Sequence, residues 1–297
     1  MEKTAETGKF CQMLRMIFLA VGIAAGLPAM VHANRSAPVA EVQTLQARLW
    51  QVLQLGDLMP IIRKEALTEA VKMQDSLFQR GGDNRWEQIV AQIHETGRLE
   101  QLLRDGLQEA VADEQAALIE EALAFYETSL GQRLIGLETS AREVILDMEA
   151  EADAKANYAH AAGMELPRIA QIKRLIDKAD LIAPNVAGGM NAALAFSRGF
   201  NEGGGYPMPM SEAQMLSDAW AHEASLRAET LDWMEAYLFL AYSPLSDAEL
   251  DRYIEFAGSS AGQALADTLF GGFDKLFEWT SYEMGLAAAG QIQGRRL

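Results

Sequence analysis

Apolar residues recur at steps of three and four along nearly the whole chain beyond residue 38. This spacing gathers them on one face of an α-helix, whereas runs of β-branched residues with period two are absent. Each proline of this region lies near the end of a periodic stretch. The pattern predicts an all-α fold, with helices at about 39–56, 60–80, 84–106, 113–127, 129–160, 165–179, 184–201, 211–242, 246–257 and 260–288.

The helix expected over 129–160 has the clearest periodicity. Its apolar stripe consists of Leu130, Leu134, Leu137, Ala141, Val144 and Met148. The opposite face is charged, and Glu138 and Arg142 on it have the spacing of a surface ion pair. A helix of about 30 residues would be roughly 45 Å long, enough to bridge two units. In the helix expected over 260–288, the corresponding stripe is Leu265, Leu269, Phe273, Leu276 and Trp279.

Three matches between the two halves of the chain predict an internal duplication. Residues 125–134 (FYETSLGQRL) recur as 256–265 (FAGSSAGQAL), an offset of 131 at which Phe, Ser, Gly, Gln and Leu coincide. Phe78 and the Gly-Gly pair after it match Phe200 and its Gly-Gly pair, and Asp57-Leu58 matches Asp180-Leu181. Because the matches keep their order, we expect two related helical units in tandem, 34–160 and 161–297. An insertion of about nine residues near 205–210 would account for the changing offset.

The repeated Ser-x-Gly-Gln motif has a structural interpretation. Its residues are Ser129, Gly131 and Gln132 in the first copy and Ser260, Gly262 and Gln263 in the second. Ser followed by Gln three residues later is the spacing of a capping box, which also occurs at Ser211 and Ser246. Glycine is unfavourable inside a helix, so the two glycines indicate close approach of another helix. A capping role is therefore favoured over a ligand site.

The same motif carries a resemblance to a known family. A Phe-Tyr-x-x-Ser-x-Gly-Gln-x-Leu run between two helices of an exported protein resembles the bacterial family called domain of unknown function 2059. Residues 125–134 match its pattern well and 256–265 match more weakly, with Ala257 in place of the tyrosine. Leu130 and Ala261 depart from the proline that the family commonly has after the serine. The resemblance implies a helical envelope protein and no particular activity.

The N-terminus has the pattern of a cleavable secretory signal peptide. Arg15 precedes an apolar run over 16–25, and Val31 and Ala33 stand at the −3 and −1 positions of a cleavage site. The run is too short to span a membrane, which takes about 20 residues, and no longer run follows. We therefore expect a signal peptide over 1–33, cleavage after Ala33, and a periplasmic or secreted protein without a membrane span. Translation could start at Met1 or at Met13.

Composition narrows the class of protein further. Of the 297 residues 49% are hydrophobic, which is too many for a disordered chain. The net charge of −17 comes without clusters of Lys and Arg and argues against nucleic-acid binding. The one cysteine, Cys11, precedes the cleavage site, so the mature chain has neither disulfides nor thiol chemistry. Its acidic residues are spread over both halves and serve solubility.

Sequence motifs assign no catalytic, cofactor-binding or metal-binding residue. His94 and His222 are each followed by Glu, but neither has the second His that a zinc-protease helix needs, and His160 stands apart. The glycines at 203–205 lack the Lys-Ser/Thr of a phosphate-binding loop. We therefore expect no metal, no cofactor and no recognisable catalytic group.

Aromatic residues are unevenly distributed between the halves. Residues 34–160 hold six and residues 161–297 hold fifteen. The simpler interpretation is a core with bulkier packing, and the sharper one is an apolar groove in the second unit. The candidate groove residues are Trp220, Trp233, Tyr237, Tyr242, Trp279 and Tyr282.

Together these features favour a non-enzymatic interaction or binding protein of the cell envelope. Its partner would be an envelope protein, a peptide or a lipid. The alternatives are a hydrolase acting on glycan or peptide through carboxylates from distant positions, and a structural or stress-related envelope protein.

Overall fold

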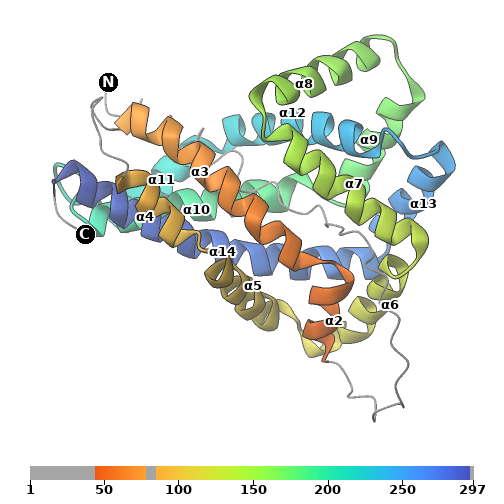
Figure 1. The fold of residues 1–297 in the computed structure, drawn as a ribbon, viewed down its shortest axis with the longest axis horizontal. Helices are drawn as coiled ribbons and strands as arrows, with labels where there is room; N and C mark the ends of the chain where they lie inside the picture. The colour runs from red at the N-terminus through yellow and green to blue at the C-terminus, as the bar shows by residue number, and fades with distance from the viewer. Residues whose placement is uncertain (1–43, 78–84, 295–297) are drawn as a thin grey trace.

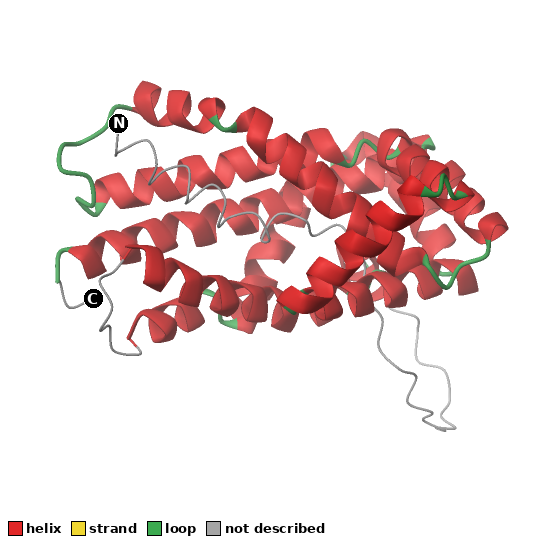
Figure 2. Ribbon diagram, turned by 90° about the horizontal axis from the view of Figure 1, so that it is seen from above, coloured by secondary structure: helices red, strands yellow, loops and turns green. Residues whose placement is uncertain are grey.

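The computed structural model describes residues 44–77 and 85–294. Within these residues the regular structure is entirely helical, as the periodicity predicts (Figures 1 and 2). The signal segment 1–33 and the first member of the Phe-Gly-Gly match, 78–82, lie outside the described residues. No described helix combines the length and the hydropathy needed to cross a bilayer.

The helices follow one another through short turns. The α-helices are α2 (Leu45–Val52), α3 (Leu58–Leu77), α4 (Arg85–Ile93), α5 (Thr96–Ala110), α6 (Ala116–Tyr126), α7 (Ser129–Ile145), α8 (Met148–Gly163), α9 (Pro167–Lys178), α10 (Ile182–Glu202), α11 (Glu212–Ala221), α12 (Glu223–Tyr242), α13 (Asp247–Ala257) and α14 (Ser260–Ile292). Short 3-10 turns, η2 (Leu55–Asp57) and η3 (Asp113–Gln115), precede α3 and α6.

Three helices expected from the sequence as single rods are each broken in two. The stretch 84–106 breaks before Glu95, whose carboxylate accepts from the Arg98 amide and caps α5. The stretch 129–160 breaks before Asp147, which caps α8 by accepting from the amides of residues 149 and 150. The stretch 211–242 breaks at His222, which ends α11 and begins α12. In the first two cases a carboxylate cap competes successfully with continuation of the helix.

The break before Asp147 corrects the expected rod over 129–160. Instead of one helix bridging two units, α7 and α8 run in different directions (Figure 1). The predicted apolar stripe holds only over its first part, because Leu130, Leu134 and Ala141 are buried whereas Val144 and Met148 are exposed.

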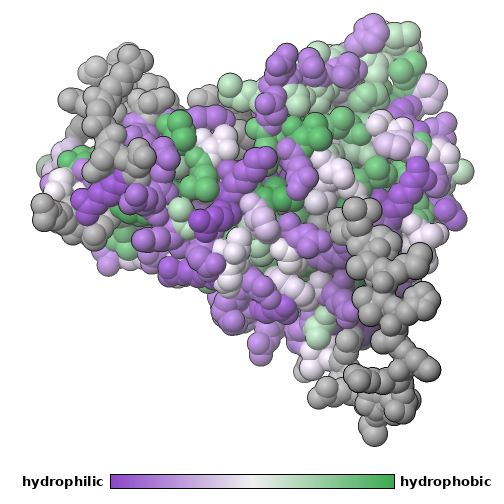
Figure 3. All heavy atoms as spheres, viewed as in Figure 1, coloured by the Kyte–Doolittle hydropathy of each residue, from purple (hydrophilic) through white to green (hydrophobic). Residues whose placement is uncertain are grey.

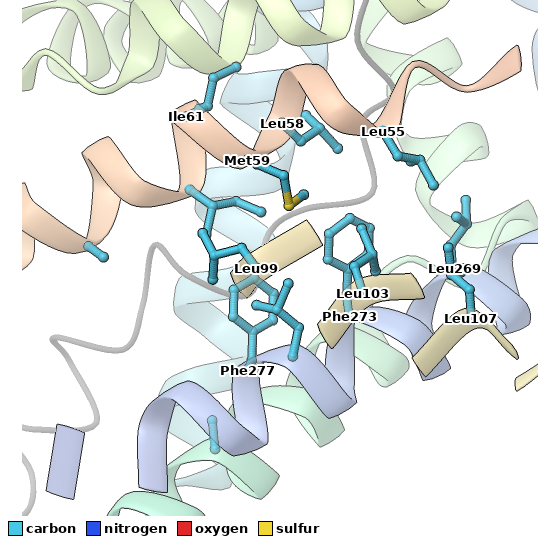
Figure 4. Close-up of a cluster of buried hydrophobic side chains, with 14 of the residues drawn as sticks. Leu55, Leu58, Met59, Ile61, Leu99, Leu103, Leu107, Leu269, Phe273 and Phe277 are labelled. Carbon is cyan, nitrogen blue, oxygen red and sulfur yellow. The ribbon is translucent and has the colours of Figure 1, made fainter. Parts of the chain in front are cut away.

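Buried apolar side chains form two clusters. The first core is built mainly by α2 to α6, α10 and α14, with Ile135 of α7. Figure 4 shows leucines of α5 meeting Phe273 and Phe277 of α14 within it. The second core is built mainly by α7, α8, α9, α12 and α13. Each core thus combines helices from both halves of the chain, and the boundary between 160 and 161 falls in the last turn of α8.

Helices α10 and α14 are the most intimately packed pair. A Cβ atom on Gly199 would lie 2.1 Å from the Tyr282 carbonyl oxygen, and one on Gly285 would lie 2.1 Å from that of Phe196. Glycine at both positions lets the two backbones touch, and this contact fixes α10 against the long C-terminal helix.

Candidate functional site

The repeated motif forms two turns of the same design, one residue out of the expected register. The N-caps are Thr128 and Ser259, whose hydroxyls accept from the amides of Gly131 and Gly262, each at 3.1 Å. The expected capping boxes at Ser129 and Ser260 are therefore wrong, because these two serines are the first residues of α7 and α14. The boxes at Ser211 and Ser246 are confirmed.

The glycines of the motif allow the close approach that the sequence predicts. A Cβ atom on Gly131 would lie 2.5 Å from the Phe125 carbonyl oxygen, and one on Gly262 would lie 2.2 Å from that of Phe256. In each case the neighbour is the end of the preceding helix, α6 or α13. The motif thus folds a helix sharply back from the one before it.

The two turns also contact each other. The Phe125 and Phe256 rings stack with centroids 3.8 Å apart and an angle of 5° between their planes. Gln132 donates to the carbonyl oxygens of Val52 and Tyr126 and accepts from Gln54, which ties its turn to the end of α2. Gln263, its counterpart, is exposed.

Beside these turns lies a buried polar cluster that sequence reasoning missed. Arg142 of α7 donates to both carboxylate oxygens of Glu65 on α3, at 2.6 and 2.7 Å. Glu138, one turn before Arg142, accepts from the Tyr242 hydroxyl. Arg142 and Glu138 are each only 2% exposed. The charged pair expected on the outer face of this helix is therefore inside the molecule.

Tyrosine hydroxyls extend the cluster: those of Tyr237 and Tyr242 come from α12, and that of Tyr253 from α13 hydrogen-bonds with Tyr126, Tyr242 and Glu138. Tyr237 donates to the Glu138 carbonyl oxygen at 3.0 Å. Burial raises the pKa of Tyr237 and of Tyr242 well above the ordinary value, so both hydroxyls keep their protons and remain donors. Burial also raises the pKa of the Glu65 carboxyl, an effect that the Arg142 guanidinium opposes. The cluster lies where α3 of the first core meets α7 and α12 of the second.

This cluster is closed rather than open to a substrate. Glu65 accepts two charge-assisted hydrogen bonds from Arg142. The backbone carbonyl and the carboxylate of Glu138 each accept a hydrogen bond from a tyrosine hydroxyl. A hydrolytic carboxylate has to meet both substrate and water. The arrangement suits a polar joint between two cores, which a paired and hydrogen-bonded set of charges can form.

His94 and His222 occupy structural positions, whereas His160 is exposed on α8. The Nδ1 atom of His94 lies 3.0 Å from the Val90 carbonyl oxygen, and that of His222 lies 2.8 Å from the Asp218 carbonyl oxygen. Each ring thus contacts the carbonyl four residues earlier, at the point where one helix stops and the next begins. No group of three or more His, Cys, Asp or Glu side chains in the described ranges could hold a metal ion.

The six aromatic residues proposed for a groove lie in three places. Trp233, Tyr237 and Tyr242 are buried in the second core, with Trp233 stacked on Tyr237 at a centroid distance of 4.6 Å. Trp279 and Tyr282 are half-buried on α14. The Cζ atom of the Arg98 guanidinium lies 3.6 Å from the centroid of the Trp279 ring. Trp220 on α11 is 61% exposed. The set is therefore not gathered into one groove, and its buried members serve packing.

Trp220 belongs instead to an exposed apolar surface. We call this surface the α11–α12 stripe and define it by Leu216, Trp220, Ala224, Ala228 and Leu231, all exposed and spaced by three or four residues. The stripe crosses the break at His222, whose φ of −101° and ψ of −2° depart from regular α-helical angles, so it has one part on each helix. On the face drawn in Figure 3, α4 and α5 present mainly hydrophilic residues, whereas hydrophobic ones form scattered patches over the upper part of the molecule.

No family model, curated protein sequence or solved structure matches this chain.

Proposed function

We propose that this chain is an exported helical protein that works by binding a partner through the α11–α12 stripe rather than by catalysis. The observation that carries the proposal is the outward face of α11. Met215 and Ala219 of this helix are buried, while Leu216 and Trp220 point to solvent. A helix that is apolar on its outer face as well as its inner one is typical of an interaction site.

The contrast with the buried cluster supports this choice. The charged groups of the buried cluster, Glu65, Glu138 and Arg142, make hydrogen bonds to one another or to tyrosines and are closed to solvent. The large side chains exposed at the stripe, Leu216, Trp220 and Leu231, are apolar. Apolar contact area favours binding and offers no acid, base or nucleophile.

We further propose that the chain is a tandem duplication, with α2 to α7 related to α9 to α14. Three features support this. The motif turns between α6 and α7 and between α13 and α14 have the same cap and the same packed glycine. A His-Glu pair stands at the break between α4 and α5 and again between α11 and α12. Gln54 and Asp180 both have positive φ, just after α2 and α9.

Export through the segment 1–33, and membership of the domain of unknown function 2059 family, belong to the same proposal. Both rest on the sequence patterns. Mass spectrometry of the protein recovered from the periplasm or medium should find Asn34 as its first residue. An intact N-terminus there would contradict cleavage.

Tryptophan emission tests the binding role, because Trp220 is an exposed reporter at the surface in question. The purified protein is titrated with envelope lipids, peptides and muropeptides, in parallel with a Trp220→Phe variant. We expect one class to shift the emission to the blue in the wild type and not in the variant. If none of the classes changes Trp220 emission, binding through the stripe is wrong.

A further inference from the structure

We infer that the α11–α12 stripe receives a cationic, amphipathic segment of a partner protein. This inference rests on the proposed binding function and adds the chemistry of the partner. It is carried by the juxtaposition of exposed apolar side chains with a strongly acidic surround on the same two helices.

The apolar part has the dimensions of a helix-binding surface. Leu216 and Trp220 are 44% and 61% exposed, and Leu231 at the far end is 40% exposed. Leu216 and Trp220 are about one turn apart on α11, and Ala224 and Leu231 are about two turns apart on α12. Three large anchors separated by small alanines resemble the shallow surface against which an amphipathic helix packs.

The charged part is almost entirely of one sign. Between 212 and 235 there are six acidic residues and one basic residue, a net charge of −5: Glu212, Asp218, Glu223, Glu229, Asp232 and Glu235 against Arg227. Arg227 is paired with Glu223, at 2.8 Å. Two bases of neighbouring helices also pair with this surface: Arg198 with Glu212, and Lys155 with Asp232 at 3.2 Å. The net charge with these two bases is −3, so a partner with Lys or Arg beside its apolar face would still meet charge of the opposite sign.

The same charges disfavour two other occupants. Helices that lie on anionic membranes carry Lys and Arg on their polar face, whereas this one carries carboxylates. A second copy of the chain would bring two surfaces of net negative charge together, and like charges across an interface are unfavourable. A cationic polypeptide is the occupant that both the apolar and the charged residues favour.

Model peptides test this inference. The probes are a helical Leu/Lys peptide of about 18 residues with one apolar face, a Leu/Glu peptide of the same pattern, and a Leu/Lys peptide of scrambled order. Vesicles of phosphatidylglycerol and phosphatidylethanolamine test the lipid alternative, and sedimentation of the protein alone tests self-association. Affinities are measured by calorimetry for the wild type, Leu216→Ser/Trp220→Ser and Asp218→Asn/Asp232→Asn.

Met164→Ser is the matched control, because Met164 is 59% exposed and lies at the C-terminal end of α8, nine residues beyond Lys155, which pairs with Asp232 next to the stripe. We expect the patterned Leu/Lys peptide to bind at least tenfold more tightly than the other two peptides. Leu216→Ser/Trp220→Ser should weaken this binding at least tenfold, Asp218→Asn/Asp232→Asn about threefold, and Met164→Ser not at all. The effect of the charge variant should shrink at high salt.

The other outcomes are distinguishable. Binding of the Leu/Lys peptide that is unaffected by Leu216→Ser/Trp220→Ser would overturn the inference, because general acidity alone would explain it. If the Leu/Glu peptide, the vesicles or a second copy binds in a Trp220-dependent way, the binding function stands and the cationic partner is wrong. Absence of any Trp220-dependent binding would overturn both.

Discussion

Helices α7 and α14 begin with the same turn and then bury opposite kinds of side chain. Each starts one residue after a hydroxyl cap and places a glycine against the helix before it. Ten residues into α7 stands Glu138, and four residues later Arg142; the same positions of α14 hold Leu269 and Phe273. All four side chains are buried, so one register supports a polar contact in one helix and an apolar contact in the other.

The difference follows from what each helix meets. Leu269 and Phe273 face the leucines of α5 inside the first core, where no polar partner is needed (Figure 4). Glu138 and Arg142 lie where the two cores join, among Glu65 and tyrosine hydroxyls. Charged pairs contribute less net stability than apolar contacts but tolerate few alternative arrangements. We infer that the polar pair defines how α3 sits against α7, while the apolar positions of α14 supply stability.

Removing Arg142 should have the largest effect on stability, and it tests the difference between the polar contact of α7 and the apolar contact of α14. Arg142→Met should lower the free energy of unfolding by about 3 to 5 kcal/mol, because Glu65 is left buried without its partner. The double change Glu65→Leu/Arg142→Met should regain most of that loss, since no unpaired charge remains. Urea unfolding of the three proteins measures both effects.

Phe273→Leu, at the matching position of α14, is the control and should cost only about 1 kcal/mol. If the double variant is as unstable as Arg142→Met, loss of packing rather than an unpaired charge is the cause. The polar contact of α7 and the apolar contact of α14 would then contribute to the free energy of unfolding in the same way, through packing.

The two His-Glu breaks, at His94 and at His222, offer a second comparison between the halves of the chain, which a change of pH can test. Burial lowers the pKa of His94 to about 4 from its ordinary value of 6.5, so the folded protein holds a neutral ring. Between these values the unfolded chain binds the extra proton, and stability therefore falls as the pH drops from 6.5 towards 4. By pH 4.5 the loss from this group should be about 2 to 3 kcal/mol.

His94→Gln should remove that part of the acid sensitivity, because an amide can still donate to the Val90 carbonyl but does not titrate. Urea midpoints at pH 7, 5.5 and 4.5 measure the effect. His222→Gln is the matched control: it removes the half-buried histidine ring at the break between α11 and α12. An unchanged pH dependence in His94→Gln would mean that other groups cause the acid sensitivity.

Periodicity predicted the helices well and their interruptions poorly. Ser211 and Ser246 stand beside obvious loops, and their capping boxes were predictable. Glu95 and Asp147 are caps too, but an acidic residue in a periodic stretch is equally typical of a helix surface. At Thr128-Ser129 and Ser259-Ser260 two adjacent hydroxyls can each cap, so the sequence did not decide the register.

The candidate sites show the same limit. Trp220 could be proposed as a contact residue from its residue type alone. The neighbouring sequence does not distinguish an exposed tryptophan such as Trp220 from a buried one such as Trp233. Glu138 and Arg142 have the spacing of a surface pair. Their burial depends on Glu65 of α3 and on tyrosines of α12, which lie far away in sequence and close only in the fold.

The two motif glycines give the smallest expected effect and test the resemblance between the turns most directly. Gly131→Ala and Gly262→Ala should each destabilise the protein by about 1 to 3 kcal/mol, because the added methyl group meets backbone of the preceding helix. Gly163→Ala is the control, since a Cβ atom there has no neighbour within 4 Å and alanine favours a helix. Thermal unfolding of the three variants should show similar losses at the two motif positions and none at Gly163. A loss at Gly262 without one at Gly131 would show that the two turns, although alike in sequence and cap, do not constrain their helices equally.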